Sequence, residues 1–354
     1  MCESLVEIMI EWLYYTGHTD WDLRFFPLSF IVAMNWTTVK AAVQEKIGDE
    51  AYSSLLSYLK DHTPALWGED QPRTFLEKAN AVALYKDLHG VGYCKLEATL
   101  AIGITLHHNS LSHNQKVLRL SWKNWALQHI QLGVYTDWKA AVRHLRVTKR
   151  FPLGMLWEDS SDIAIQRGKG RGKSSPWWSW KLNRPGCCYM TLVDGKCRAR
   201  KVWRGYSPKI YDGQFVSSTE EWYHEKLGGA GVFADQHFAK ATRTWKDPVF
   251  YCPYRLSKDL ENEDEAKIRS DDEEGEDVEM VTSEDNPHGE GAQTLTAKQR
   301  GWNKALHKMR AKVEIPYGQV KSKWKALDLP WPEDLEQLDC VVFTAFAVWN
   351  FSRN

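Results

Sequence analysis

Hydrophobic positions along the chain follow two different periods, and the change falls near residue 150. In the first part, apolar residues recur every three or four positions, which predicts amphipathic helices within 1–50, over 51–59 and over 75–88. Beyond residue 150, short apolar runs alternate with polar positions and turn residues, a pattern typical of strands. The sequence therefore predicts an N-terminal all-α domain over 1–150 and an α/β domain over 151–354 with a mixed sheet.

The helical part contains one further pattern of interest. Residues 93–105 and 110–125 are both helical in character, with Gly103 and a capping residue (Asn109 or Ser110) between them. A helix-turn-helix over about 90–125 would present Lys116 and Arg119 to DNA. An ordinary hairpin of two helices with a solvated polar face fits the same residues, and the two alternatives stay open.

The second part is expected to alternate strands and helices. The predicted strands are 151–167, 177–182, 187–193, 197–203, 232–235 and 248–254, and the predicted helices are 212–227, 294–327 and 341–351. Asp194-Gly195 separates two of the strands at the spacing of a hairpin turn.

The charge is distributed unevenly over the 354 residues, although the formal net charge is zero. Between Asp259 and Glu290 lie 15 of the 46 acids and 2 of the 46 bases, so the rest of the chain carries 31 acids and 44 bases, a net charge of +13. The segment 258–293 is acidic and poor in aromatic residues, which predicts disorder. A basic body favours a polyanionic partner, and the acidic segment would then shield that surface or simply be a solvated linker.

Composition narrows the class of protein further. The 43% hydrophobic content supports a sizeable core, and the 18 Trp residues are unusually many. The seven cysteines include no CxxC pair, and the N-terminus lacks a basic region followed by an apolar one. No apolar run is long enough to span a bilayer. We therefore expect a soluble intracellular protein with reduced thiols.

A glycine-rich basic loop follows the first predicted strand. Its bases are Lys169, Arg171 and Lys173 within residues 168–175, and Pro176 with a Trp-rich strand comes next. That layout differs from the strand-loop-helix arrangement of a phosphate-cradling Walker loop. The loop is expected to contact a phosphate backbone, and a solvated surface loop is the alternative.

Three acids stand in positions that suggest a cation site. Asp159 lies inside the first strand of the α/β part, Asp235 ends a short apolar strand, and Glu314 lies on a helix with a basic face. A carboxylate that enters a core must be neutralised, hydrogen-bonded or bound to a cation. If these three converge, they form a site for a hard divalent ion.

Two neighbouring residues are candidates for supporting roles. Asp212 competes with Asp235 for a ligand position, although its place at a helix start also suits an N-cap. Arg310 lies one helical turn before Glu314, where it could orient that carboxylate, hold a phosphate or form a plain surface ion pair. Lys308 and Lys321 on the same helix are expected to contact a DNA backbone.

Several segments of the second half resemble motifs of PIF/Harbinger-type DDE transposases, in the order in which that family has them. They are Asp159-Ser-Ser-Asp-Ile-Ala-Ile165, Gly205-Tyr-Ser-Pro-Lys-Ile-Tyr-Asp212, Phe233-Ala-Asp-Gln-His-Phe238, Thr296–Asn303, Arg310-Ala-Lys-Val-Glu314 with Gly318-Gln-Val-Lys321, and Val348-Trp-Asn-Phe351. The resemblance covers about residues 150–354. It implies an RNase H-like mixed-sheet nuclease core in which Asp159, Asp235 and Glu314 are the catalytic and metal-binding acids.

The resemblance also implies a chemistry and a set of partners. Two Mg²⁺ or Mn²⁺ ions would support cutting of phosphodiester bonds at transposon ends, followed by joining of the 3′-OH ends to target DNA. The implied partners are double-stranded DNA with terminal inverted repeats, a Myb/SANT-like protein and further copies of the chain in a synaptic complex, all in the nucleus.

The chain departs from the family pattern at a few positions. Ser160 follows Asp159 where the family has Gly, Gln236 and His237 replace a Gly-Tyr pair, and Pro316 lies two residues after Glu314. These departures favour an alternative, a catalytically inactive domesticated transposase that acts as a DNA-binding regulator. A sugar hydrolase with a carboxylate pair is a third interpretation, suggested by the Trp content.

Overall fold

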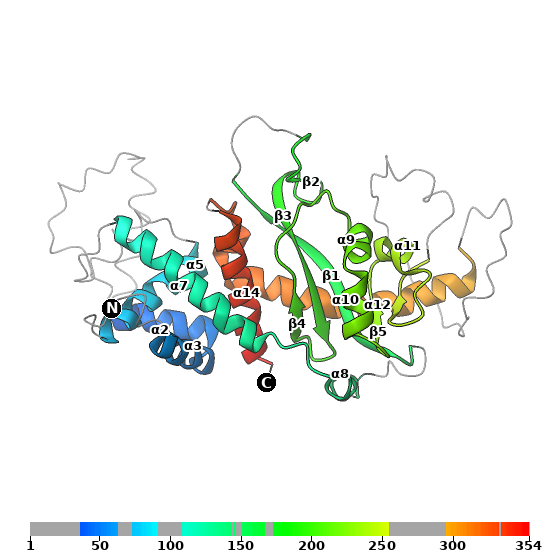
Figure 1. Cartoon of the computed structure of the whole chain (residues 1–354), viewed down its shortest axis with the longest axis horizontal. Helices are drawn as coiled ribbons and strands as arrows, with labels where there is room; N and C mark the ends of the chain where they lie inside the picture. The colour runs from blue at the N-terminus through cyan, green and yellow to red at the C-terminus, as the bar shows by residue number, and fades with distance from the viewer. Residues whose placement is uncertain are drawn as a thin grey trace, which may run out of the picture.

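The computed structural model describes residues 36–62, 73–90, 108–143, 145, 151–166, 173–254, 295–332 and 334–353. Four predictions fall outside these residues, in whole or in part: the helical segment expected before residue 36, the first helix and turn of the proposed helix-turn-helix, the loop positions Lys169 and Arg171, and the acidic segment 258–293. The described chain is a mixed α/β structure (Figure 1).

A six-stranded mixed sheet forms the second half of the described chain. Its strands are β1 (Gly154–Ala164), β2 (Trp178–Ser179), β3 (Arg184–Asp194), β4 (Ala199–Val202), β5 (Gly231–Phe233) and β6 (Val249–Tyr251). The order is β2-β3-β1-β5-β6, with β4 also paired to β3. β1 is antiparallel to β3 and parallel to β5, and β5 is parallel to β6. β1 is therefore central, and each predicted strand region contains an observed strand.

The β3–β4 hairpin forms where the sequence predicted it. The Asp194 carboxylate accepts hydrogen bonds from the backbone amides of Lys196 (2.9 Å) and Arg198 (3.1 Å), and it pairs with the guanidinium of Arg200 at 2.8 Å. Cys197 adopts a positive φ of 61° to complete the turn. A buried carboxylate compensated in this way stabilises a tight connection.

The helix predicted over 212–227 is two helices, α9 (Asp212–Ser218) and α10 (Glu220–Lys226). Thr219 separates them, because its hydroxyl donates a hydrogen bond to the Phe215 carbonyl at 2.9 Å and its backbone φ is −119°. The short helices η3 (Gln236–Phe238) and α11 (Ala239–Thr242) follow β5.

Helix α12 (Ala297–Lys323) spans most of the region predicted to be helical between 294 and 327. Thr296 and Gln299 form a capping box at its start, with hydrogen bonds of 3.2 and 2.9 Å. The helix continues through Pro316 and is followed by α13 (Lys325–Asp328). The last helix, α14 (Leu335–Phe351), is almost entirely buried and begins earlier than the predicted 341.

The remaining helices are α2 (Trp36–Ile47), α3 (Asp49–His62), α5 (Arg73–His89), α7 (His108–His129) and α8 (Tyr135–Val142). The first four lie on one side of α14, and the sheet lies on its other side (Figure 1). Trp125 of α7 stacks on Phe351 of α14 with ring centroids 5.6 Å apart. One continuous set of buried apolar residues therefore joins the helical half to the sheet half. None of the described helices is both long enough and apolar enough to cross a membrane.

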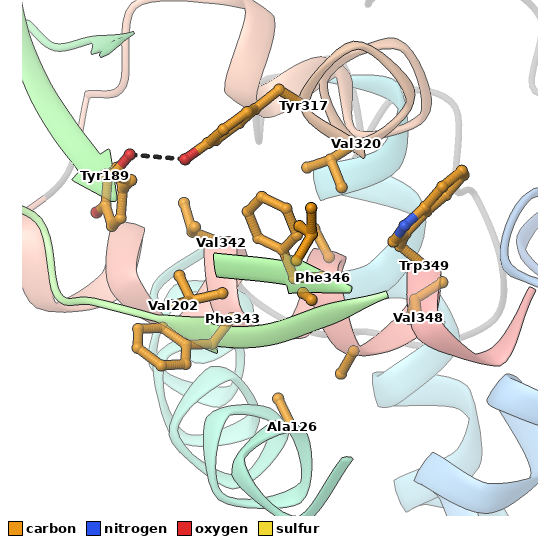
Figure 2. Close-up of a cluster of buried hydrophobic side chains, with 14 of the residues drawn as sticks. Ala126, Tyr189, Val202, Tyr317, Val320, Val342, Phe343, Phe346, Val348 and Trp349 are labelled. Atoms are coloured by element: carbon orange, nitrogen blue, oxygen red, sulfur yellow. Dashed lines mark hydrogen bonds between the residues drawn. The ribbon is translucent and has the colours of Figure 1, made fainter. Parts of the chain in front are cut away.

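Contacts between α12 and the sheet set the position of the candidate site. Figure 2 shows Tyr317 and Val320 of α12 facing Val342 and Phe346 of α14. The Tyr317 hydroxyl donates to the backbone carbonyls of Tyr189 (2.8 Å) and Asp159 (3.1 Å). One turn later, the Lys321 ammonium donates to the Ser161 hydroxyl at 2.8 Å. α12 is thus held against β1 at the position of Asp159.

Candidate functional site

The site lies where β5 ends beside β1. The two strands pair only as far as Trp157 opposite Phe233, whereas β1 continues to Ala164. Beyond this point β1 keeps its antiparallel partner β3 but has no described strand on its other side. Asp159 lies two residues past the last β1–β5 pair. Functional groups of α/β proteins commonly gather at such strand ends.

Asp235 belongs to the turn that follows β5. Its carboxylate accepts a hydrogen bond from the Gln236 backbone amide and so caps η3. The same carboxylate forms a two-point ion pair with Arg310 of α12, at 3.2 Å from Nη2 to Oδ2 and 3.4 Å from Nη1 to Oδ1. Asp235 is therefore neutralised by a cation that the protein itself supplies.

Asp159 is partly buried, and the positive charge of Arg310 acts on its carboxylate. Its Oδ1 accepts a 2.8 Å hydrogen bond from the Ser160 backbone amide. Burial raises the pKa of the Asp159 carboxyl to about 6, although the Ser160 hydrogen bond and the positive charges of Arg310 and Lys181 oppose this rise. Nearby cations therefore leave the negative charge of Asp159 only partly compensated.

Asp212 completes what we call the acidic centre (Asp159, Asp212 and Asp235). It is the first residue of α9, and Tyr211 occupies the N-cap position, so the expected N-cap role of Asp212 is wrong. Burial raises the pKa of the Asp212 carboxyl; Lys181, a hydrogen bond with Ser160 and His237 act against this rise, and the charge of Asp235 reinforces it. Asp212 thus interacts with both of the other acids.

Lys181 is a part of the site that the sequence did not reveal. Its ammonium donates to the Ser160 hydroxyl at 3.2 Å. Burial lowers the pKa of Lys181, but the charges of Asp212, Asp162 and Asp159 outweigh burial, so the net pKa is raised. The residue lies 21 positions after Ser160 in a Trp-rich stretch, with no local pattern that could have marked it.

Glu158, next to Asp159, is a second unexpected residue. It is 1% exposed, it shares a short hydrogen bond with the Tyr223 hydroxyl of α10, and its Oε2 has no hydrogen-bond partner among the described residues. Burial raises the pKa of the Glu158 carboxyl to about 8, against the effect of the Tyr223 hydrogen bond. Glu158 is therefore a neutral acid near pH 7, and it is followed in β1 by the largely ionised Asp159, whose side chain projects from the opposite face of the strand.

Glu314 lies apart from the acidic centre. It is exposed on α12, one turn beyond Arg310, and its neighbour Ile315 is 42% exposed. Over the part of the chain that the structure describes, no three His, Cys, Asp or Glu side chains gather closely enough to hold a metal ion. Helix α12, which bears Glu314, forms as predicted. The side chain of this helix that pairs with an acid of the acidic centre is Arg310, which binds Asp235.

The predicted DNA contacts are distributed over several surfaces. Lys116 of α7 and Lys308 of α12 are exposed, and Lys173 is exposed with its ammonium 5.6 Å from the ring centroid of Trp180. Lys321 is partly buried against β1, where it also donates to the Asp162 carbonyl at 2.9 Å.

Arg119 was expected to face DNA, and the structure corrects this expectation. Its side chain is 0% exposed and pairs with the buried Asp87 of α5 at 2.6 Å. The guanidinium also lies 4.8 Å from the ring centroid of Trp331. The face of α7 that bears Arg119 is covered by neighbouring elements, so this residue stabilises the fold and cannot reach a nucleic acid.

No protein-family model, curated protein or solved structure matches the chain.

Proposed function

We propose that the chain is a metal-dependent DNA endonuclease of the DDE transposase type, which cuts at transposon ends and joins the 3′-OH ends to target DNA. The observation that carries the proposal is the grouping of the acidic centre, in which the charge of Asp212 acts on Asp159 and the charge of Asp235 acts on Asp212. Arg310 pairs with Asp235 and acts electrostatically on Asp159, and it belongs to the helix that bears Glu314.

The order of elements supports an RNase H-like core. That core is expected to run strand, hairpin, strand, helix, strand, strand, helix, with acids on the first strand, on a later strand and on the final helix. Here β1 and the β3–β4 hairpin are antiparallel, α9 and α10 follow, β5 and β6 run parallel to β1, and α12 crosses β1. This agreement rests on topology and is independent of the motifs.

The carboxylates of the acidic centre are the type of ligand that a hard divalent cation takes, although the described residues do not bring three of them close enough to hold an ion. The pKa values of Asp159 and Asp212 are raised because burial outweighs the available positive charge, so a divalent ion would relieve uncompensated charge there. Asp159, Asp235 and Glu314 would hold Mg²⁺ or Mn²⁺, with Asp212 as an alternative ligand. When bound, such ions stabilise the charge that develops on phosphate oxygens.

The protein's own groups have definite roles in this mechanism. The ammonium of Lys181 and the guanidinium of Arg310 are positioned to bind a phosphate that enters the acidic centre. Tyr317 holds the backbone of β1 at Asp159 and so orients that carboxylate. Glu158 adds no negative charge while it is protonated, which limits repulsion of a DNA phosphate.

Cleavage of supercoiled plasmid DNA tests the proposal. With Mn²⁺ or Mg²⁺, the full-length protein should produce nicked circles, and Asp159→Asn should slow nicking by at least about 100-fold. Glu225→Gln neutralises an exposed carboxylate paired with Lys226 and serves as the matched control. Equal nicking by the wild type and the Asp159 variant would rule out the catalytic role.

A second candidate function is DNA binding without catalysis, by a domesticated transposase. The Asp235–Arg310 ion pair and the exposed position of Glu314 favour it, because an internal cation already neutralises one expected metal ligand. This candidate predicts strongly salt-dependent DNA binding and no Mn²⁺ binding that depends on Asp159. Titration calorimetry with Mn²⁺ distinguishes the two candidates.

The wider setting is also a proposal, and it rests on the resemblance of the motifs. The substrate would be double-stranded DNA with terminal inverted repeats and a target site, in the nucleus. A Myb/SANT-like protein would assist recognition, and further copies of the chain would assemble around two DNA ends.

A further inference from the structure

Trp180 is the most exposed of the large apolar side chains in the described residues, at 65%. Other tryptophans, among them Trp122, Trp157 and Trp331, are almost fully buried. An indole that remains in water forgoes the favourable burial of a large apolar surface. A single exposed residue of this kind needs no explanation by itself, so its surroundings decide whether it is a binding feature.

The turn that carries Trp180 is anchored on both sides. Trp178 pairs with Pro185, and the Gly186 amide donates to the Trp177 carbonyl at 2.8 Å. The buried Ser179 hydroxyl donates to Asp162 and accepts from the Leu182 amide at 3.1 Å. The indole is therefore held outward on a fixed turn, and little conformational freedom remains to be lost when a ligand binds.

One cation lies over the ring, and two others lie on neighbouring segments. The Lys173 ammonium lies 5.6 Å from the Trp180 centroid, and Lys209 donates to the Ser174 carbonyl at 3.1 Å. Arg184, paired with Ser179 across the β2–β3 ladder, is exposed. A flat aromatic face next to several cations suits a nucleotide, whose base stacks while its phosphate is neutralised.

The residue that follows Trp180 in the chain contacts the strand that bears Asp159. This residue, Lys181, is exposed; its ammonium donates to the Ser160 hydroxyl at 3.2 Å and interacts with Asp159 and Asp212. Consecutive Cα atoms are about 3.8 Å apart. A DNA strand that places a phosphate at Lys181 therefore passes the Trp180 ring within the next nucleotides.

We propose that Trp180 is a stacking platform for an unpaired or extruded DNA base next to the acidic centre, with Lys173 contacting the adjoining phosphate. Bases inside a duplex already stack on both faces, so only an unpaired or extruded base can use the ring. The inference deepens the proposed function, on which it rests, by naming the form of DNA that the site prefers. The platform would select strand ends, forks or distorted junctions over intact duplex.

Binding measured in EDTA tests this inference without any dependence on cleavage. The probes are a forked duplex with a 2-aminopurine in the unpaired arm and a blunt duplex of the same length. Trp180→Ala should weaken binding of the forked probe by roughly 5- to 100-fold and change binding of the blunt probe by less than about twofold. Trp180→Phe should retain most of the preference for the fork and most of the quenching of 2-aminopurine.

A matched control comes from another aromatic residue with a nearby lysine. Tyr135 is 36% exposed, with the Lys139 ammonium 6.0 Å from its ring centroid, so Tyr135→Ala should leave both affinities unchanged. Equal loss for both probes in Trp180→Ala, or no loss for the fork, would overturn the inference. A protein that prefers the fork but never cuts would instead refute the proposed catalysis and leave the stacking platform intact.

Discussion

Arg310 of α12 and Asp235 after β5 form an ion pair across 75 residues of sequence, with Nη2 and Oδ2 3.2 Å apart. The guanidinium also lowers the pKa of Asp159 relative to what burial alone would produce. One arginine thus compensates two of the three predicted catalytic acids. Arg310 therefore lies where a bound cation would compensate the negative charges of these two carboxylates.

Arg310→Gln should therefore leave the charges of both acids less compensated. We expect the pKa of Asp159 to rise above about 6 and Mn²⁺ to bind roughly 3- to 10-fold more tightly, because the ion no longer competes with the guanidinium. Carboxyl NMR titration and calorimetry measure the two effects. Arg243→Gln removes an exposed cation and serves as the control. Weaker Mn²⁺ binding by the Arg310 variant would show that Arg310 positions the acids.

Glu158 predicts a pH dependence of folding stability. Its pKa rises from 4.5 in the unfolded chain to about 8 in the fold, so the folded state holds a proton that the unfolded state releases. This contribution is complete below pH 4.5 and is lost as the pH rises through 8. Between pH 6 and 8 the free energy of unfolding should fall by about 1.4 kcal/mol per pH unit.

Glu158→Gln should remove most of that slope, since an amide can still bond to the Tyr223 hydroxyl but does not titrate. Urea unfolding at several pH values in this range measures the effect. Glu225→Gln, at an exposed carboxylate, should keep the wild-type slope. An identical slope in the Glu158 variant would mean that another group binds the proton.

Substitutions at two residues of α7 should have different effects, one on folding stability and the other on DNA binding. Arg119→Ala leaves Asp87 buried and unpaired, so the free energy of unfolding should fall by about 3–5 kcal/mol. Lys116→Ala changes an exposed side chain and should alter stability by less than about 0.5 kcal/mol. If Lys116 contacts a DNA phosphate, its loss should also reduce the slope of log affinity against log salt by about 1.

Thermal or urea unfolding and DNA binding at several salt concentrations check both variants. A folded Arg119→Ala protein with normal stability and weakened DNA binding would contradict the structural role assigned to Arg119.

The acidic segment yields a prediction from charge alone. Deleting residues 259–290 removes 15 acids and 2 bases, which leaves the chain with a net charge of +13. If the segment shields the basic surface, the deletion should tighten non-specific duplex binding at low salt by about 10-fold or more. Unchanged affinity at low salt would identify the segment as a linker.

The sequence alone determined those helices, strands and turns that depend on residues close together along the chain. The alternation of polar and apolar residues predicted β1, and the Asp194-Gly195 pair predicted the hairpin between β3 and β4. Helix α12 was also expected, and its start at Thr296 shows the capping box that a local pattern can encode. Propensity and periodicity act over a few residues, so they can be recognised along the chain.

The tertiary structure alone decided which polar groups are neutralised, and by what. The sequence suggested that Arg119 is a surface base. In the fold, its guanidinium bonds to Asp87, 32 residues away, and lies over the ring of Trp331. Lys181 and the Glu158–Tyr223 pair have no local signature, because their partners lie 21 and 65 residues away along the chain. Burial and charge compensation depend on which helix covers which strand, and that depends on the packing of the whole core. For this reason Arg310, rather than Glu314, is the α12 residue whose side chain pairs with a carboxylate of the acidic centre.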